Sequence, residues 1–311
     1  MHRGLIGTAA ACLFILSASK PMTVHAASAI KVAATVAPVH SLVAMVTEGI
    51  AEPALIVRPG ASPHGYALKP SEAQALDRAD LVFWVGEGLE PWMAKAVTTL
   101  ASDAAVVELA GVDGLIRLPI REAGVFEEHA HDEPGEHGHD AAFDPHLWLD
   151  PDNAVTWLDA ITGALEEVDP SHAAAYRANA DQAKDKLSAM TTEIEQMLKP
   201  IGDKPYVVFH DAYQYFEHRF GLAPIGAISL GEANRPGPAT IVGIRDAIAA
   251  SGAVCIFSEP QFEPKLTQTV IEGSDVKSGV LDPIGAGLQP GAELYRALMM
   301  GLAGGLAGCL G

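Results

Sequence analysis

A single long helical pattern in the middle of the chain constrains its fold more than any other feature. The pattern begins at Asp169-Pro170 and ends at Lys199-Pro200, and apolar residues recur in it at alternating spacings of three and four. They are Ala173, Tyr176, Ala180, Ala183, Leu187, Met190, Ile194 and Met197. This spacing predicts one helix with one apolar stripe. At about 1.5 Å per residue, such a helix spans about 40 Å, the length of two small lobes.

Short β-branched runs alternate with helical stretches on both sides of this helix. Before it they lie at 31–33, 54–57, 81–85 and 105–108, and after it at 206–209, 225–228, 254–257 and 278–281. The alternation predicts an α/β fold with two Rossmann-like lobes, each a four-stranded, mostly parallel sheet with flanking helices. We expect an N-terminal lobe at 27–165, the long linking helix at 166–200 and a C-terminal lobe at 201–311.

The first 26 residues have the pattern of an export signal. Arg3 supplies a positive start, residues 5–19 are apolar, and residues 24–26 form a small-residue cleavage site. The alternative is a membrane anchor, but the apolar stretch is shorter than the roughly 20 residues needed to cross a bilayer. We therefore expect residues 1–26 to be a cleaved signal peptide and the mature protein to reside in the periplasm.

The charge of the chain limits its partners. The full sequence has 20 Lys and Arg against 39 Asp and Glu, and the loss of Arg3 and Lys20 with the signal leaves 18 against 39, a net charge of −21. A surface this negative repels the phosphate backbone, so we expect no nucleic acid partner.

Two cysteines remain once Cys12 has left with the signal. In an oxidising compartment Cys255 and Cys309 either form a disulfide that holds the Gly-rich C-terminus or stay as two buried thiols.

Residues 127–140, EEHAHDEPGEHGHD, are the one low-complexity segment of the sequence. Nothing in it is apolar enough to be buried, so we expect a surface loop. Its four histidines are candidates for weak, secondary metal binding, and the alternative is a solvated spacer. They are His129, His131, His137 and His139.

Four further residues are candidate ligands because of where they fall relative to the predicted strands. His64 follows the second strand in a loop rich in Pro and Gly, His210 ends the strand at 206–209, and Asp282 follows the last strand. In open α/β sheets, ligands bind beyond the carboxyl ends of the strands. His146 lies in FDPHLWLDP, where Asp144 or Asp150 is placed to orient its ring. Taken singly, each of these is more often a capped or hydrogen-bonded polar residue than a ligand.

Together the motifs resemble the ZnuA-type zinc-binding proteins of ATP-driven importers, within the zinc and manganese solute-binding proteins. The resemblance covers nearly all of the mature chain in the family's order. It rests on PGASPH at 59–64, LKPS at 68–71, FDPHLWLDP at 143–151, FHDAY at 209–213, SEPQF at 258–262 and LDPIG at 281–285.

The resemblance implies that His64, His146 and His210 bind Zn²⁺ between two lobes and that Asp282 lies at the fourth position. Some relatives have an acidic residue before the first histidine, but Pro63 stands there in this chain, so the fourth ligand is expected to be Asp282 or a water. A disulfide between Cys255 and Cys309 is likewise implied. The implied partner is the membrane permease of an ABC zinc importer, and a periplasmic zinc chaperone is a further expected partner. We expect the protein to be a monomer.

Four alternatives to a zinc carrier follow from the same residues. Manganese relatives have a carboxylate where His210 stands, and manganese prefers more oxygen ligands, so His210 favours zinc over manganese. Cu²⁺ and Ni²⁺ also bind imidazoles, so a broader divalent-metal binding protein is a further alternative. Some relatives are surface adhesins, so a metal-dependent adhesin is a third alternative. A zinc hydrolase also uses three histidines, but the chain has no His-Glu-x-x-His helix, and its only candidate general bases are Asp282 and Glu259. We therefore expect no enzyme activity.

Overall fold

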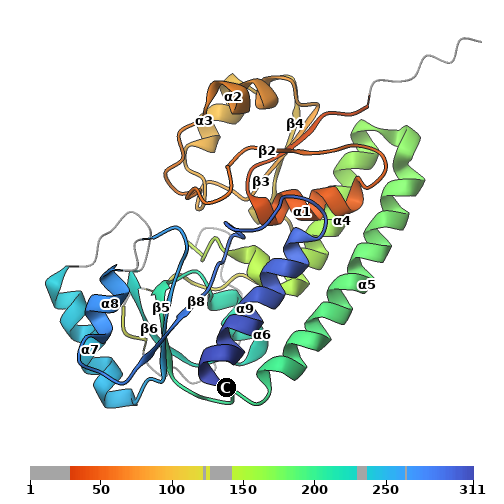
Figure 1. Cartoon of the computed structure of the whole chain (residues 1–311). Coiled ribbons are helices and arrows are strands. Elements are labelled where there is room, and N and C mark those ends of the chain that lie inside the picture. Colours follow the sequence, from red (N-terminus) through yellow and green to blue (C-terminus); the bar gives the residue numbers. More distant parts are fainter. Residues whose placement is uncertain (1–28, 122–123, 127–141, 230–236, 263–264) are drawn as a thin grey trace, which may run out of the picture.

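Two parallel sheets of four strands each form the framework of the computed structural model (Figure 1). The structure describes residues 29–121, 124–126, 142–229, 237–262 and 265–311. The expected signal peptide at 1–26 and the His-rich segment at 127–140 lie outside these residues. In the described part no helix has the length and hydropathy to span a membrane.

The first sheet has the strand order β2-β1-β3-β4. Its strands are β1 (Val32–Ala34), β2 (Ala54–Leu55), β3 (Leu81–Trp84) and β4 (Ala105–Glu108). The helices of this half are α1 (Ala37–Val46), α2 (Pro70–Asp77), α3 (Met93–Thr99) and α4 (Pro151–Val168), with short 3-10 turns η1 (Leu109–Gly111) and η2 (Leu147–Leu149). Every strand pair is parallel, as the βα alternation of the sequence predicts.

The second sheet repeats this arrangement with the order β6-β5-β7-β8, again with parallel pairs only. Its strands are β5 (Tyr206–His210), β6 (Pro224–Ser229), β7 (Cys255–Ser258) and β8 (Lys277–Val280). Its helices are α6 (Gln214–Phe220), α7 (Pro238–Ser251), α8 (Lys265–Ile271) and α9 (Leu294–Leu310). The predicted two-lobed α/β fold is therefore confirmed.

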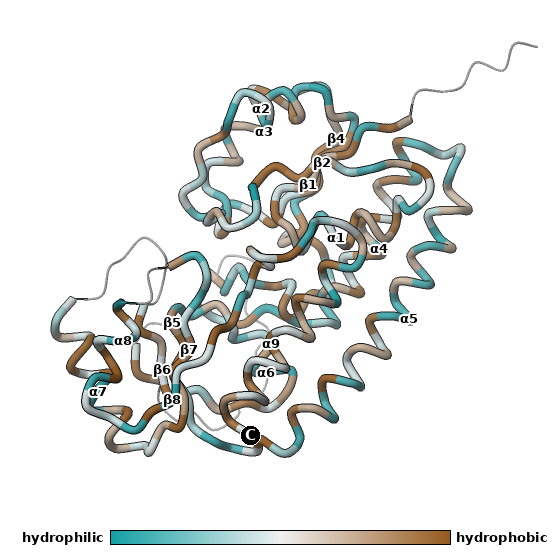
Figure 2. Tube along the Cα trace, in the orientation of Figure 1, coloured by the Kyte–Doolittle hydropathy of each residue, from teal (hydrophilic) through white to brown (hydrophobic). Residues whose placement is uncertain are grey.

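The long helix α5 (Ala173–Leu198) joins the two halves (Figure 1). Its buried stripe contains Tyr176, Ala180, Ala183, Leu187, Met190, Thr191, Ile194 and Leu198. Figure 2 shows hydrophobic and hydrophilic residues alternating along it, as one buried face requires. The helix begins later than the sequence pattern, because a 3-10 turn, η3 (Pro170–His172), forms where Asp169 accepts hydrogen bonds from Ser171 and the His172 ring.

One apolar core runs through both halves. It contains Leu42 of α1, Leu187 of α5 and Leu298 of α9. The Oγ of Ser41 in α1 donates to the carbonyl of Ala292 at 3.0 Å and accepts from the backbone N–H of Tyr295 at 2.9 Å. A wide hinge motion would expose this shared core to water, so we expect only small opening motions.

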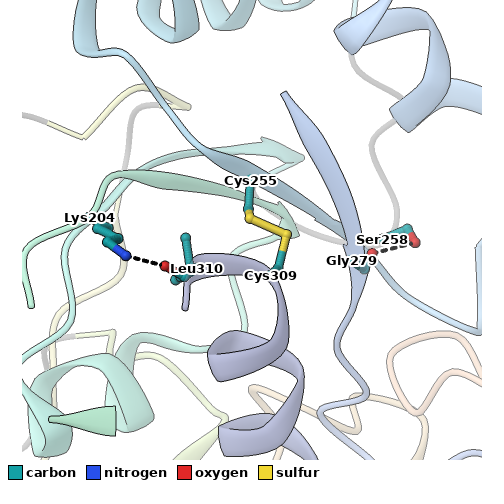
Figure 3. The surroundings of a disulfide bond; sticks show 6 residues. All are labelled: Lys204, Cys255, Ser258, Gly279, Cys309 and Leu310. Carbon is teal, nitrogen blue, oxygen red and sulfur yellow. Dashed lines mark hydrogen bonds between the residues drawn. A yellow bond between two sulfur atoms is a disulfide. The ribbon is translucent and has the colours of Figure 1, made fainter. Parts of the chain in front are cut away.

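The C-terminal helix is attached covalently to the second sheet (Figure 3). Cys255 of β7 and Cys309 of α9 form a disulfide with their Cα atoms 6.2 Å apart. Beside it, Nζ of Lys204 donates to the carbonyl of Leu310 at 2.6 Å. These two bonds hold the last turn of a helix whose Gly-rich sequence favours fraying.

Candidate metal centre

Three histidines from distant parts of the sequence meet between the two halves. His64 lies in the loop between β2 and α2, His146 directly precedes η2, and His210 is the last residue of β5. One ligand nitrogen from each ring lies within 4.8 Å of the other two. The ring centroids are 5.5 Å apart for His64 and His146, 6.2 Å for His64 and His210, and 5.1 Å for His146 and His210.

The loop that carries His64 is braced from two sides. Oε1 of Glu72 accepts hydrogen bonds from the hydroxyl of Tyr66 at 2.8 Å and from Nε of Arg58 at 2.9 Å. From the other side, Nε1 of Trp92 donates to the carbonyl of Pro63 at 2.7 Å. Since Pro63 directly precedes His64, this bond fixes the backbone at the candidate ligand although the loop has no regular secondary structure.

His146 is oriented by Asp144, as the sequence suggested. The Oδ1 atom of Asp144 lies 2.7 Å from Nδ1 of His146 and also accepts the backbone N–H of His146 at 2.9 Å. Asp150, the other residue considered for this role, instead accepts the backbone N–H of Asp152 and caps α4. Carboxylate bonding at Nδ1 leaves Nε2 to a metal ion.

His210 has a matching partner in Glu259, which lies 3.0 Å from Nδ1 through Oε1. The sequence indicates Glu259 only as a candidate general base of a hydrolase and does not predict its contact with His210. A signal for it existed. Glu259 directly follows β7, β7 pairs in parallel with β5, and His210 ends β5, so both residues occupy the same edge of one sheet.

Burial keeps two of the three imidazoles neutral, those of His64 and His146. It lowers the pKa of His64 to about 3, with a further contribution from the neighbouring His146 and His210. Burial also lowers the pKa of His146 well below its usual value, again aided by His210. A neutral imidazole is the form that binds a metal ion, so the site is ready for a cation at neutral pH.

Asp282 lies outside this cluster of three ligand atoms among the described residues. Its Oδ1 accepts the backbone N–H groups of Ile284 at 3.2 Å and Gly285 at 2.9 Å, and Nε2 of Gln261 at 3.3 Å. Its Oδ2 faces the backbone N–H of Gly287 at 3.4 Å. The carboxylate therefore shapes the loop after β8, and most of its hydrogen bonds are on Oδ1.

The donor set fits a small divalent cation that accepts nitrogen ligands. Tetrahedral Zn²⁺ with Zn–N distances of about 2.0–2.1 Å places its nitrogens about 3.3 Å apart. The three ligand atoms, at no more than 4.8 Å, reach that spacing with small side-chain adjustments. Asp144 and Glu259 each place a carboxyl group against Nδ1 of a candidate ligand. Burial raises the pKa of Asp144 to about 7, and a cation bound nearby would favour its ionised form, so the two groups can balance a divalent charge in a buried site.

The chain is similar over most of its length to curated zinc uptake proteins. The chain is 43% identical over 304 residues to the high-affinity zinc uptake system protein ZnuA of Brucella abortus. This similarity covers 90% of this chain and 91% of that protein. It is 39% identical to the protein of the same name from Paracoccus denitrificans, over 88% and 89% of the two chains.

Solved structures show the same fold. A crystal structure of ZnuA superposes with a TM-score of 0.75 at 22% identity, covering 91% of this chain and 100% of that one. The solute-binding protein FpvC of Pseudomonas aeruginosa, solved in complex with Mn²⁺, also has a TM-score of 0.75, at 21% identity over 91% and 98%. These likenesses show the shared fold.

The family model described as ZnuA, zinc-uptake complex component A, periplasmic, matches residues 32–309. This match spans both sheets, the long helix and all three clustered histidines, and the chain belongs to the ZnuA family.

Proposed function

We propose that this protein captures one Zn²⁺ between its two halves and delivers it to a membrane importer. The convergence of three histidine rings on one point, two of which burial keeps neutral, carries this proposal. The proposed ligands are His64, His146 and His210. Relatives named as high-affinity zinc uptake proteins at 39–43% identity support the same function.

Zinc is favoured over manganese by the chemistry of the donors. Manganese prefers oxygen ligands and a higher coordination number, whereas three imidazoles suit tetrahedral zinc. The two buried carboxylates nearest the ligands, Asp144 and Glu259, are bound to ring nitrogens of the histidines. For the fourth position we propose an oxygen ligand, either Asp282 or a water.

The proposal extends to location and partners. Residues 1–26 would direct export to the periplasm, where the mature protein, with lobes at 27–165 and 201–311 around the linking helix at 166–200, would act as a monomer. The permease of an ABC zinc importer is the proposed recipient of the ion, and a periplasmic zinc chaperone is a second proposed partner. The family's description as a periplasmic component of a zinc-uptake complex supports this placement.

The His-rich segment has two proposed roles, weak capture of additional zinc or a solvated spacer. Flexible ligands must be ordered when they bind, so sites formed by His129, His131, His137 and His139 should be weaker than the preorganised centre. Calorimetry on a protein without residues 127–140 separates the two roles. Loss of a weak second binding phase would support capture, whereas an unchanged stoichiometry with one tight site would support the spacer.

The main proposal is tested by zinc-edge X-ray absorption on the loaded protein. We expect three imidazole nitrogens and one oxygen in the parent, and one nitrogen fewer in each of His64→Ala, His146→Ala and His210→Ala. Asp282→Asn reports whether the oxygen belongs to Asp282. Retention of three nitrogens in all three histidine variants would contradict the assigned site. Ester hydrolysis by the zinc-loaded protein above the rate of free zinc would favour a hydrolase instead.

A further inference from the structure

One stretch of the N-terminal half leaves that half and attaches to the second sheet. We name it the crossing segment, residues 116–121 and 124–126. Figure 1 shows its yellow trace beside β6. At its start, the backbone of Ile116 exchanges hydrogen bonds with the side chain of Asn153 in α4. At its end, the backbone N–H of Phe126 donates to the carbonyl of Ile225 in β6 at 2.9 Å.

Two glycines allow the crossing segment to approach β6 closely. The backbone N–H of Ala227 donates to the carbonyl of Gly124 at 2.9 Å, and Val125 forms an antiparallel bridge with Gly226. A Cβ atom added at Gly226 would lie 2.3 Å from the oxygen of Gly124, a distance that real contacts do not reach. The contact therefore depends on glycine at position 226, and through it the crossing segment pairs with the outer edge of β6.

Arg121 is the charged residue of the crossing segment that enters the second half. Its Nη1 donates to Oδ1 of Asp211 at 2.8 Å, and its Nη2 donates to Oε2 of Glu217 in α6 at 2.9 Å. The guanidinium lies over the ring of Phe126, 4.2 Å from its centroid. Both acids are buried, so the planar fork of an arginine, with one nitrogen on each carboxylate, suits this place better than a lysine.

The crossing segment holds the chain next to two of the three zinc ligands. The carbonyl of Leu118 accepts the backbone N–H of Asp144 at 2.9 Å. The hydroxyl of Tyr215 accepts the N–H of Leu118 and donates to the carbonyl of Asp144. Asp144 orients His146. Asp211, which Arg121 binds, directly follows His210 in a tight turn where the N–H of Ala212 donates to the carbonyl of His210 at 2.9 Å.

We propose that Arg121 is a positioning residue of the zinc site. It links the turn after His210 to the crossing segment, and the crossing segment also binds Asp144, which orients His146. It does not touch the ion. It acts by preventing rotation of the turn at Asp211, so that the His210 ring keeps its place relative to the His146 ring and its bond to Glu259. Without Arg121, the buried carboxyl groups of Asp211 and Glu217 would lose the donor that joins them, and the turn would lose its link to the crossing segment.

This inference rests on the proposed zinc function and is tested with three variants. Arg121→Gln removes the link. The double variant Arg121→Gln/Glu217→Gln removes one positive and one negative charge together, so the formal charge of the cluster stays the same, and it serves in place of a single variant that fails to fold. The control is Arg245→Gln, which removes another arginine with several hydrogen bonds in the same half. Arg245 lies in α7 and donates to the carbonyls of Thr269, Val270 and Glu272, in and just after α8.

Two measurements are made on each variant. The zinc dissociation constant is obtained by competition with a chromophoric chelator, and nitrogen NMR of the metal-free protein reports which ring nitrogen of His210 is protonated. We expect the dissociation constant to rise about tenfold in the Arg121 variants, the scale found when the support of a metal ligand is removed. We also expect loss of the single Nδ1–H form of His210, and a change below twofold in Arg245→Gln.

A folded Arg121 variant with a dissociation constant within twofold of the parent and an unchanged His210 ring would overturn the proposal, since Arg121 would then only stabilise the fold. If Arg121→Gln does not fold, the double variant is judged by the same two criteria. A parent protein that binds no zinc would instead refute the proposed function. The NMR of the metal-free histidines would still decide the role of Arg121.

Discussion

The carboxylate of Glu259 holds the ring of His210 through Nδ1, with its two oxygens at 3.0 and 3.2 Å, although the residues are 49 positions apart. His210 sits at the end of β5 and Glu259 just beyond the end of β7, the neighbouring strand. The contact places the carboxylate at Nδ1, which leaves Nε2 to the metal ion that we propose. It also places a negative charge behind a ligand that is neutral in its metal-binding form.

Glu259→Gln should weaken zinc binding about tenfold, because the amide keeps the shape of the side chain but loses the charge that supports the imidazole. Competition with a chelator measures the effect. The matched control is Glu193→Gln on α5, where the glutamate pairs with Arg296 at the surface and should not influence the site. Equal zinc affinity in the Glu259 variant and the parent would show that His210 is held by other contacts.

The metal-free protein should lose stability on acidification partly through His64. Its pKa is about 3 in the folded state and about 6.5 in the unfolded state, so below pH 6.5 the unfolded chain takes up the proton first. The stability contributed by neutral His64 is present above pH 6.5 and is lost as the pH falls towards 3. Between pH 7.5 and pH 5 this amounts to at most about 2 kcal/mol.

Urea unfolding of the parent and of His64→Gln at both pH values isolates this contribution from the other acids and histidines. The parent should lose more free energy of unfolding than the variant over this interval. If both lose the same amount, the folded protein does not keep His64 neutral.

Removal of the disulfide should destabilise the protein without changing its zinc stoichiometry. Cys255 and Cys309 close a loop over a sequence separation of 54, which corresponds to about 2–4 kcal/mol in the free energy of unfolding. Urea unfolding of a Cys255→Ser/Cys309→Ser variant measures the loss. Calorimetry should still find one tight zinc site, because neither cysteine lies in the ligand cluster. A variant as stable as the parent would show that the bridge restrains little of the unfolded chain.

Gly226→Ala should cost about 1–3 kcal/mol of stability, because its Cβ would lie 2.3 Å from the backbone oxygen of Gly124 and would push the crossing segment away from β6. Thermal or urea unfolding measures this. Gly243→Ala in α7 is the matched control, since a Cβ there meets nothing within 4 Å and should stabilise the helix by about 0.5–1 kcal/mol. Equal stability of the two variants would mean that the crossing segment adapts freely.

The sequence by itself determined the local structure, because hydrophobic period and strand-end chemistry are properties of short stretches of chain. The stripe from Tyr176 to Ile194 predicted α5, and the β-branched runs predicted the eight strands of two parallel sheets. Position at the end of a strand selected His64 and His210 as candidates, and the resemblance to a known family grouped them with His146.

Only the tertiary structure decided which distant groups touch, because such contacts depend on how sheets and segments pack. The pairing of β5 with β7 brings Glu259 to His210, and the crossing segment brings Arg121 to Asp211, over separations of 49 and 90 residues. The loop after β8 turns the carboxylate of Asp282 onto backbone N–H groups. Hydrophobic periodicity predicts none of these contacts, since each depends on the relative placement of elements whose local patterns are independent of one another.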